Sequence, residues 1–340
     1  MSNELKTLTE QMLPAMNQEM KEVFQVNNAP TLFYGMMHYH MGWVDADMQP
    51  ISIYAGKQIR PLMCMLACAA AGGDWQQAIP AAAAIEILHN FSLIHDDIED
   101  NSPTRRNRET VWKLWGIPQA INAGDAMFAI AHLALNRLIE RGVSADIVVQ
   151  SLRRFDETCV RLTQGQQADM DFETRAQVST DEYIDMITGK TAVLVSLSME
   201  LGALIAGADP ATVKNYAQFG LDLGLAFQVI DDILGIWGDE AIIGKSASTD
   251  ITTKKKTLPV LYGLAQSQEL QTLYATAEPN QAFVQQVVTL LGENGADTYA
   301  KEKATSYSHS ALQNIEGANP QGKAGQALYQ LTDMLLKRDF

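Results

Sequence analysis

Two apolar runs that each end in a pair of aspartates constrain the fold of this chain more than any other feature. The run from 85 to 94 leads into Asp96-Asp97, and the run from 219 to 230 leads into Asp231-Asp232. Apolar side chains recur in both runs at the three- and four-residue spacing of a helix that packs into a core. Charged pairs on such helices seldom lack a partner. The two runs therefore predict a pair of facing helices with matching acidic ends.

The same helical spacing continues through most of the chain. It recurs in seven segments, near 5–25, 52–72, 76–100, 117–142, 144–172, 179–207 and 211–237, and short Gly-, Pro- and Asp-containing breaks separate them. Strand alternation is scarce, no Gly/Ser-rich linker divides the chain, and the pattern stays helical beyond about residue 261. We therefore expect an all-α fold, a single helical-bundle domain that spans residues 1–340.

The charge and composition of the chain limit its binding partners and its cellular location. A net charge of -15 argues against general affinity for nucleic acid or anionic membranes. The N-terminus lacks the apolar core of a secretory signal, and the uncharged stretch 61–73 is shorter than the roughly 18 apolar residues of a membrane span. These features predict a cytoplasmic protein without integral membrane association. Cys64 and Cys68 share one helical face in an apolar segment, which is typical of core residues rather than of a disulfide.

The first acidic cluster has the residue types of a magnesium site. On a helix Asp96 and Asp100 lie one turn apart on the same face, with Asp97 beside them. Carboxylate oxygens are ligands that Mg²⁺ prefers, and the ion usually bridges protein carboxylates to substrate phosphates. A solvated acidic helix end is the plainer explanation of this cluster taken alone. Asp231-Asp232, with Gln228 one turn before Asp231, favours the metal site, because facing helices of a bundle can hold metal ions together.

Basic residues outside the acidic clusters suggest a pocket for polyphosphates. Guanidinium and ammonium groups are the natural donors to diphosphate oxygens. Each of these residues alone is more often a surface charge, but the chain as a whole is acidic. The set consists of Lys57, Arg60, Arg105, Arg106, Lys190, Lys245 and Lys254 to Lys256.

These motifs together resemble those of the trans-type polyprenyl diphosphate synthases, the family of farnesyl and geranylgeranyl diphosphate synthases. The likeness runs from about Gly56 to Gly263, with the motifs in the family's order. Asp96-Asp97-Ile98-Glu99-Asp100 followed by Arg105-Arg106 resembles the first aspartate-rich motif with its arginine pair. The resemblance implies an isoprenoid-synthase bundle with the active site in a central cavity, Mg²⁺ as cofactor, and a homodimer.

The resemblance also implies a role for each matching residue. Mg²⁺ would be held by Asp96, Asp97, Asp100, Asp231 and Asp232, which with Lys190 form the expected catalytic set. Isopentenyl diphosphate would be bound by Lys57, Arg60, His89 and Arg106. The allylic diphosphate would be held by Arg105, with further substrate contacts expected from Lys190, Thr191, Gln228, Lys245 and Lys255.

The sequence departs from the family's pattern in three segments. Gly235 stands where the second motif usually carries its third aspartate, Gln58 replaces an arginine of the upstream motif, and Ser248 and Lys254 replace glycines of the later loop. The change at Gly235 predicts fewer metal contacts in the second motif but not their loss. The other two changes affect segments expected to bind diphosphate.

The implied reaction is ionisation of an allylic diphosphate, condensation with isopentenyl diphosphate and loss of a proton. Electrostatic stabilisation of the leaving pyrophosphate and positioning of the two substrates account for catalysis, and no side-chain nucleophile is required. Phe91, five residues before Asp96, is expected to form the floor that limits product length. The predicted product is geranylgeranyl diphosphate, with farnesyl diphosphate as the second choice.

Two other functions share parts of this pattern. A class I terpene cyclase would have the fold and the first acidic motif, but it would have no use for Lys57, Arg60 and Arg106. A non-catalytic partner subunit of another prenyl synthase would have little reason to keep both acidic pairs and the lysines. The prenyl synthase is therefore the favoured reading.

Overall fold

A computed structural model describes residues 3–25, 32–51, 56–238 and 249–337. Helices dominate these residues, which confirms the expected all-α class, and the described strands form one two-stranded hairpin. The first half of the chain contains α1 (Asn3–Val23), α2 (Leu32–His40), α3 (Ile59–Ala70), η1 (Trp75–Ala78), α4 (Ile79–Glu99), β1 (Thr104–Arg105), β2 (Arg108–Glu109), α5 (Val111–Trp115), α6 (Ile117–Asn136), η2 (Arg137–Arg141) and α7 (Ala145–Thr174). The second half contains α8 (Thr180–Ile187), η3 (Thr188–Ala192), α9 (Val193–Ile205), α10 (Pro210–Trp237), α12 (Thr249–Thr252), α13 (Leu258–Gln266), α14 (Gln268–Thr276), α15 (Gln281–Glu293), α16 (Ala296–Ala318) and α17 (Gly322–Leu336).

Most predicted segments match helices within a few residues, but three local features differ. The helix expected over 52–72 begins only at Ile59, because Gln58 before it has a left-handed backbone with φ of 46°. Helix α2 and the β1–β2 hairpin were not expected from the sequence pattern. The helix expected over 179–207 is continuous, but η3 within it is a π-helical turn.

The chain divides into two compact units, and neither is a continuous piece of sequence. Unit 1 contains residues 1–156, 197–214 and 318–328, and unit 2 contains residues 157–196, 215–317 and 329–340. Four of the boundaries fall inside the helices α7, α9, α10 and α17. The single domain over 1–340 stays a prediction.

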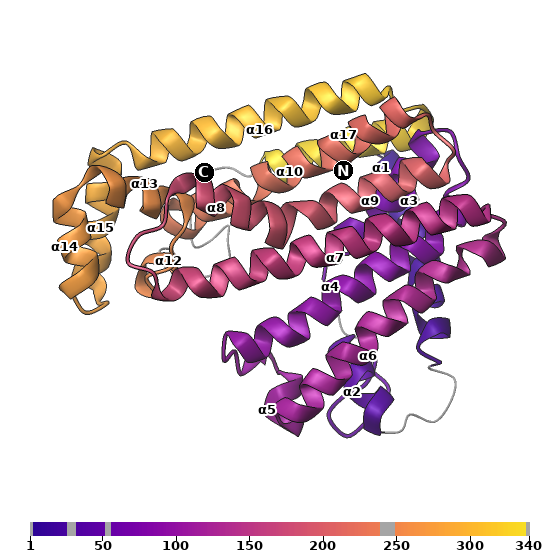
Figure 1. The fold of residues 1–340 in the computed structure, drawn as a ribbon, viewed down its shortest axis with the longest axis horizontal. Coiled ribbons are helices and arrows are strands. Elements are labelled where there is room, and N and C mark those ends of the chain that lie inside the picture. The colour runs from indigo at the N-terminus through magenta and orange to yellow at the C-terminus, as the bar shows by residue number, and fades with distance from the viewer. Residues whose placement is uncertain (1–2, 26–31, 52–55, 239–248, 338–340) are drawn as a thin grey trace. The chain divides into compact units, whose positions relative to one another are not determined.

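In unit 1, α4 runs beside α6, and α1 and α3 also pack on α4 (Figure 1). Met12, Met16 and Met20 form a fully buried stripe at four-residue spacing along α1. The buried Glu19 carboxylate accepts hydrogen bonds from Arg137 Nε at 2.5 Å and Arg141 Nη2 at 2.6 Å. These contacts fix the last part of α1 to η2.

In unit 2, α10 supplies much of the core around which the other helices pack. Leu225, Val229 and Ile233 point into a cluster with residues of α8, α13 and α16. The buried Asp222 carboxylate of α10 accepts hydrogen bonds from Ser310 Oγ at 2.6 Å and Asn314 Nδ2 at 3.0 Å on α16. The position of the second acidic pair on α10 is thereby fixed within unit 2.

Within the residues that the structure describes, two helical stretches are long and apolar enough to cross a membrane, and the expectation based on 61–73 overlooked them. They are Trp75–Glu99 and Thr180–Ile205, and 72% and 67% of their most apolar windows are buried inside the protein. Core helices of water-soluble proteins pass the same test of length and composition, so the burial explains their apolar character. Cys64, Cys68 and Cys159 are free thiols in buried positions, which confirms the expected role of Cys64 and Cys68 as core residues.

Candidate active site

The first acidic motif occupies the last turn of α4, and its central carboxylate is buried. Asp97 is 2% exposed and accepts a hydrogen bond from Arg105 Nε at 2.7 Å. Burial raises the pKa of Asp97, while the Arg105 guanidinium counteracts that shift. Asp96 is half-buried and Asp100 is exposed at the C-terminal end of the helix. The motif therefore has one enclosed carboxylate and two more accessible ones.

A tight hairpin holds the arginine pair next to this motif. Arg105 of β1 pairs with Arg108 of β2, and the two residues between them, Arg106 and Asn107, have positive φ of 52° and 60°. Two positive φ values are the pattern of a type I′ turn, whose twist matches an antiparallel pair of strands. Arg108 is anchored because its guanidinium donates to the carbonyls of Tyr39 and Val44, both at 2.9 Å.

The upstream basic motif meets this hairpin through Gly56. A Cβ atom at Gly56 would lie 3.2 Å from Arg106 Nη2, and the glycine has a φ of 105° that disfavours any other residue. The Arg106 guanidinium therefore lies directly against the start of the motif that contains Lys57 and Arg60. Lys57 is exposed.

Arg60 of α3 and His89 of α4 are half-buried, and the charge of Arg60 acts on His89. Burial lowers the pKa of Arg60, while the charge of Glu86 opposes that shift. Burial lowers the pKa of His89 well below its ordinary value, and the charges of Arg60 and Arg106 lower it further. His89 is therefore neutral at physiological pH. Within the described residues, Arg60 Nε is buried without a hydrogen-bond partner.

His40 belongs to the same group of side chains, although the sequence pattern did not single it out. It lines a small pocket of about 30 Å³ with Arg105, Arg106 and Arg108. Burial, followed by the charges of these three arginines, lowers the pKa of His40 to about 3. His40 is far from Arg105 in the sequence, so only the folded structure shows that the two residues lie close together.

Phe91 lies in a column of aromatic rings within unit 1. Its ring centroid is 5.0 Å from that of His95 and 5.3 Å from that of Phe128 on α6. Phe128 in turn lies 4.7 Å from His132, which lies 5.1 Å from Phe155 on α7. The residue predicted to limit product length is therefore supported by a second aromatic layer.

In the second acidic motif, as in the first, one carboxylate is buried and its neighbour is more accessible. Asp232 is 2% exposed and accepts hydrogen bonds from Tyr183 Oη at 2.6 Å, Leu258 N at 3.1 Å and Gln228 Nε2 at 3.2 Å. Burial raises the pKa of Asp232 to about 6, against the lowering effect of these hydrogen bonds. Asp231 is half-buried. Gln228 also accepts a hydrogen bond from Thr191 Oγ1 at 3.2 Å, which links two predicted substrate-binding residues.

The π-helical turn η3 positions Lys190. This turn passes close to α7 where Gly189 meets Gly165. A Cβ at Gly165 would lie 2.2 Å from the backbone nitrogen of Lys190, so only glycine allows this close approach. The Lys190 ammonium donates to Asp169 Oδ2 at 2.5 Å. π-Turns are frequent at functional sites, because the extra residue redirects side chains that a regular helix would orient otherwise.

Gly235 stands where the family's second motif usually has its third aspartate, and a carboxylate from another segment lies beside it. A Cβ at Gly235 would lie only 2.3 Å from Asp250 Oδ2, so the Asp250 carboxylate fills the space beside the glycine. Gly235 follows Asp231 by one helical turn, and the two therefore share a face of α10. The sequence pattern missed Asp250, which is distant in sequence from the aspartate pair.

The predicted site residues fall into two groups, one in each unit. Unit 1 brings together Arg60, His89, Asp97, Arg105 and Arg106, with Lys57, Phe91, Asp96 and Asp100 on the same or adjoining segments. Unit 2 brings together Thr191, Gln228, Asp232 and Lys255, with Lys190 and Asp231 on the same helices. Lys245 lies outside the described residues. No group of three or more His, Cys, Asp or Glu side chains placed to hold a metal occurs in the described part of the chain.

Comparison with known proteins identifies the family. The model of the polyprenyl synthetase family matches residues 42–291, which is most of the chain. Both acidic motifs lie within the matched residues. The protein therefore belongs to the polyprenyl synthetase family.

Several proteins are similar to this chain along much of its length. A (2E,6E)-farnesyl diphosphate synthase of Mycobacterium bovis is 44% identical over 230 residues, which cover 68% of this chain and only 63% of that relative. A geranylgeranyl diphosphate synthase of Mycobacterium tuberculosis is 38% identical over 309 residues, 89% of this chain and 86% of the relative. The crystal structure of a polyprenyl synthetase from Streptomyces coelicolor A3(2) superposes with a TM-score of 0.87 at 30% identity, covering 98% of this chain and 99% of that one.

Proposed function

We propose that the protein is a short-chain trans-prenyltransferase that joins isopentenyl diphosphate to an allylic diphosphate. The observation that carries this proposal is the contact between Arg106 and Gly56, which unites the arginine pair with the upstream Lys57 and Arg60 motif. A group of cations with the neutral His89 suits a diphosphate that keeps its phosphates throughout the reaction. A terpene cyclase, which uses no isopentenyl diphosphate, would not need this group.

The accessible carboxylates of the two acidic motifs fit the chemistry of Mg²⁺. Asp100 is exposed, and Asp96 and Asp231 are half-buried, so their oxygens can reach a hydrated ion. Asp97 and Asp232 are buried and hydrogen-bonded, and we assign them to holding each motif in shape as well as to the predicted metal set. Asp250, beside Gly235, is a further carboxylate for the second motif. The chemistry that Mg²⁺ would supply, if held by these carboxylates, is neutralisation of the negative charge that develops on the leaving pyrophosphate.

The remaining residues bind and orient the two substrates. We expect Arg105, Lys190 and Lys245 to donate to the allylic diphosphate, although Lys245 lies outside the described residues, and we assign Lys255 as a further ligand of this diphosphate. The C–O bond of the allylic substrate breaks and leaves the electron pair on pyrophosphate. Lys57, Arg60, Arg106 and neutral His89 hold isopentenyl diphosphate, so that its double bond attacks the allylic carbon. A proton is then lost to the released pyrophosphate and a new double bond forms. Positioning of two bound substrates supplies much of the rate enhancement in such a reaction.

The aromatic column supports a short product. Phe91 and Phe128 place two rings in sequence below the end of α4, where a growing chain would extend. We propose geranylgeranyl diphosphate as the product and farnesyl diphosphate as the alternative, and the names of the similar proteins include both activities.

We also propose that the protein acts as a cytoplasmic homodimer. Helix α6 leaves Ile117, Ile121 and Leu133 45%, 44% and 60% exposed, although its opposite face is buried in unit 1. A second copy of the chain would cover these apolar side chains. Sedimentation of the purified protein tests this part of the proposal, because a Leu133→Glu variant should sediment as a monomer.

Product analysis tests the proposed reaction directly. The purified protein is incubated with labelled isopentenyl diphosphate and dimethylallyl, geranyl or farnesyl diphosphate, with and without Mg²⁺, and the dephosphorylated products are separated by chromatography. Mg²⁺-dependent linear prenyl alcohols are expected. Cyclic hydrocarbons formed without isopentenyl diphosphate would identify a cyclase instead, and the absence of any product would favour a non-catalytic partner subunit.

A further inference from the structure

The three consecutive lysines 254–256 of unit 2 lie in two different environments. The ammonium groups of Lys254 and Lys256 are half-buried and donate to backbone carbonyls, whereas the Lys255 side chain is exposed. A run of like charges on a solvated loop would leave all three side chains exposed. The alternation shows that the middle lysine is presented by a loop that is fixed on both sides.

The backbone at Lys254 adopts a conformation that normally selects glycine. Lys255 N donates to Asp250 O at 2.8 Å and Lys254 N donates to Ile251 O at 3.0 Å, the two hydrogen bonds of a Schellman motif at the end of α12. Lys254 has the left-handed φ of 53° that this motif requires. A lysine in this conformation strains the backbone, and a favourable side-chain contact can offset that cost.

The Lys254 side chain makes that contact with the end of α14. Its ammonium donates to Tyr274 O and Ala277 O, both at 2.8 Å, and lies 5.4 Å from the centre of the Phe283 ring. The last carbonyls of a helix have no partner inside the helix and carry partial negative charge. An ammonium group can donate hydrogen bonds to these carbonyls, and its positive charge is attracted to their partial negative charge.

The Lys256 side chain makes an equivalent contact with the end of α7. Its ammonium donates to Phe172 O in the last turn and to Arg175 O just beyond it. Burial and the charge of Arg175 lower the pKa of Lys256, and the charge of Glu173 opposes them. The loop is thereby attached to a second helix on the other side of Lys255.

Lys255 lies between these two attachments and close to the second acidic motif. Its charge acts on the Asp232 carboxylate, which also accepts a hydrogen bond from Leu258 N three residues further along the loop. Within the described residues, the Lys255 ammonium has no hydrogen bond or ion pair of its own. It is therefore available to a ligand while its backbone is held in place.

We propose that Lys254 and Lys256 are positioning residues that hold Lys255 in place for the diphosphate of the allylic substrate. The inference rests on the proposed function, because it takes Lys255 to be a diphosphate ligand. The inference also gives a structural role to Lys254, which stands where the family usually has a glycine. Lys254 anchors the loop to α14, and Lys256 anchors it to α7.

Binding of magnesium pyrophosphate provides a test that does not depend on turnover. Isothermal titration calorimetry is performed on the full-length protein and on Lys254→Gly, Lys256→Met and Lys255→Ala variants, with the exposed Lys214→Met as a matched control. Glycine at 254 relieves the left-handed strain, so this variant removes the anchor without destabilising the loop backbone. Lys256→Arg keeps a donor for the carbonyls at the end of α7.

Loss of either anchor should raise the dissociation constant for pyrophosphate by about 2- to 12-fold, the cost of ordering one flexible side chain on binding. Lys256→Arg should recover most of this loss, and Lys214→Met should bind like the wild type. In the prenyl-transfer assay, the KM for the allylic diphosphate should rise while that for isopentenyl diphosphate, whose proposed ligands lie in unit 1, stays the same.

Wild-type affinity in both anchor variants would overturn the inference, as would equal rises in the two KM values, which would indicate a general structural effect. Unchanged pyrophosphate affinity in Lys255→Ala would also overturn it. If the wild-type protein forms no prenyl product but the anchor variants still bind pyrophosphate more weakly, the proposed function fails and the positioning role stands.

Discussion

The two aspartates of each acidic pair have different surroundings. Asp97 and Asp232 are both 2% exposed and hydrogen-bonded to protein groups, whereas their neighbours Asp96 and Asp231 are half-buried. Adjacent residues on a helix point about 100° apart, so one of the pair faces the core when the other faces the site. A buried carboxylate needs such partners to offset its desolvation.

Removal of the Arg105 guanidinium should therefore destabilise unit 1. An Arg105→Met variant leaves the Asp97 carboxylate buried without its partner at 2.7 Å, and we expect a loss of about 1–3 kcal/mol in the free energy of unfolding. Urea denaturation at pH 7 measures this loss. The double variant Arg105→Met/Asp97→Asn should recover much of the stability, and a single variant as stable as the wild type would refute the role assigned to this pair.

The aromatic column predicts how product length responds to substitution. A Phe91→Ala variant should make longer products, but Phe128, whose ring centroid lies 5.3 Å from that of Phe91, should stop the chain again. The double variant Phe91→Ala/Phe128→Ala should therefore extend the products further. Chromatography of dephosphorylated products measures the length.

Phe128→Ala alone serves as the matched control, because Phe91 remains and the product should keep its length. An unchanged product in Phe91→Ala would remove Phe91 as the floor. A double variant with the same product as Phe91→Ala would remove Phe128 as the second layer.

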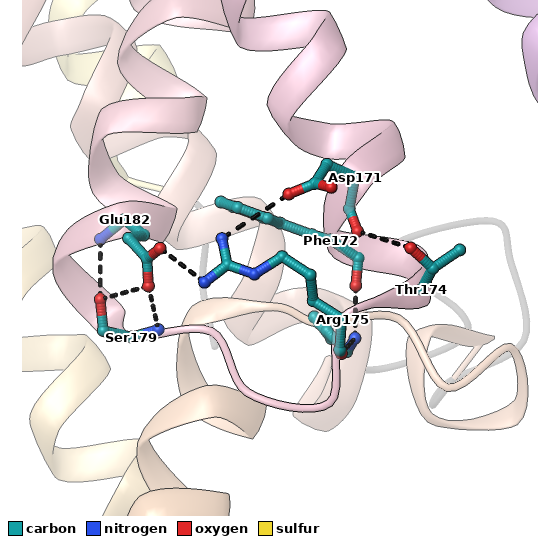
Figure 2. Close-up of polar contacts among 7 residues, drawn as sticks. Asp171, Phe172, Thr174, Arg175, Ser179 and Glu182 are labelled. Atoms are coloured by element: carbon teal, nitrogen blue, oxygen red, sulfur yellow. Dashed lines mark hydrogen bonds and ion pairs between the residues drawn. The ribbon is translucent and has the colours of Figure 1, made fainter.

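At the scale of elements, the junction between α7 and α8 is held by one arginine and one glutamate. Figure 2 shows the Arg175 guanidinium between Asp171 and Glu182, with its Nη2 2.7 Å from Glu182 Oε1. Glu182 also accepts hydrogen bonds from Ser179 N and Oγ, which completes a capping box at the start of α8. The junction carries one of the two carbonyl groups to which Lys256 is anchored.

This junction should make the stability of the protein depend on pH in a defined direction. Hydrogen bonds from Ser179 and Arg175 lower the pKa of Glu182 from its ordinary value of 4.5 to about 2. The folded state therefore favours the charged carboxylate, and the stabilisation is present above pH 4.5 and lost as the pH falls toward 2.

A Glu182→Gln variant should have a lower urea midpoint than the wild type at pH 7, and the difference should shrink progressively below pH 4.5. Midpoints measured at intervals from pH 7 to pH 3.5 test this, with the exposed Glu278→Gln as control. A difference that stays constant with pH would show that the charge of Glu182 contributes nothing.

At the scale of the whole molecule, the division into two units does not coincide with the ends of elements. Helices α7, α9, α10 and α17 each contribute residues to both units. A helix forms cooperatively, because each added hydrogen bond depends on the turn before it. This arrangement supports the prediction of one domain over residues 1–340.

We expect the protein to unfold in one thermal transition. Scanning calorimetry should give a van't Hoff enthalpy equal to the calorimetric enthalpy, as for a single cooperative domain. Sedimentation at the same concentration serves as the control, because dissociation of a dimer would broaden the transition. Two separate transitions would show that the units unfold independently and would contradict the single-domain prediction.

Local pattern was sufficient for most of the helices and for the identity of the motifs. The spacing of apolar residues predicted seven helical segments, and six of them match within a few residues, because helix periodicity is a property of neighbouring residues. Helix α2 and the hairpin at 104–109 escaped prediction. Arg106 and Asn107 turn with positive φ, and neither is a glycine that would have signalled this conformation.

The sequence by itself determined the helical class, the two acidic motifs and the basic residues that accompany them, since each depends on residue type and short-range spacing. Only the tertiary structure decided which aspartate of each pair is buried, which of the three lysines is exposed, and that Asp250 lies beside Gly235. The physical reason is that burial and hydrogen bonding depend on segments far apart in the chain. Such contacts leave no trace in the local spacing of residues.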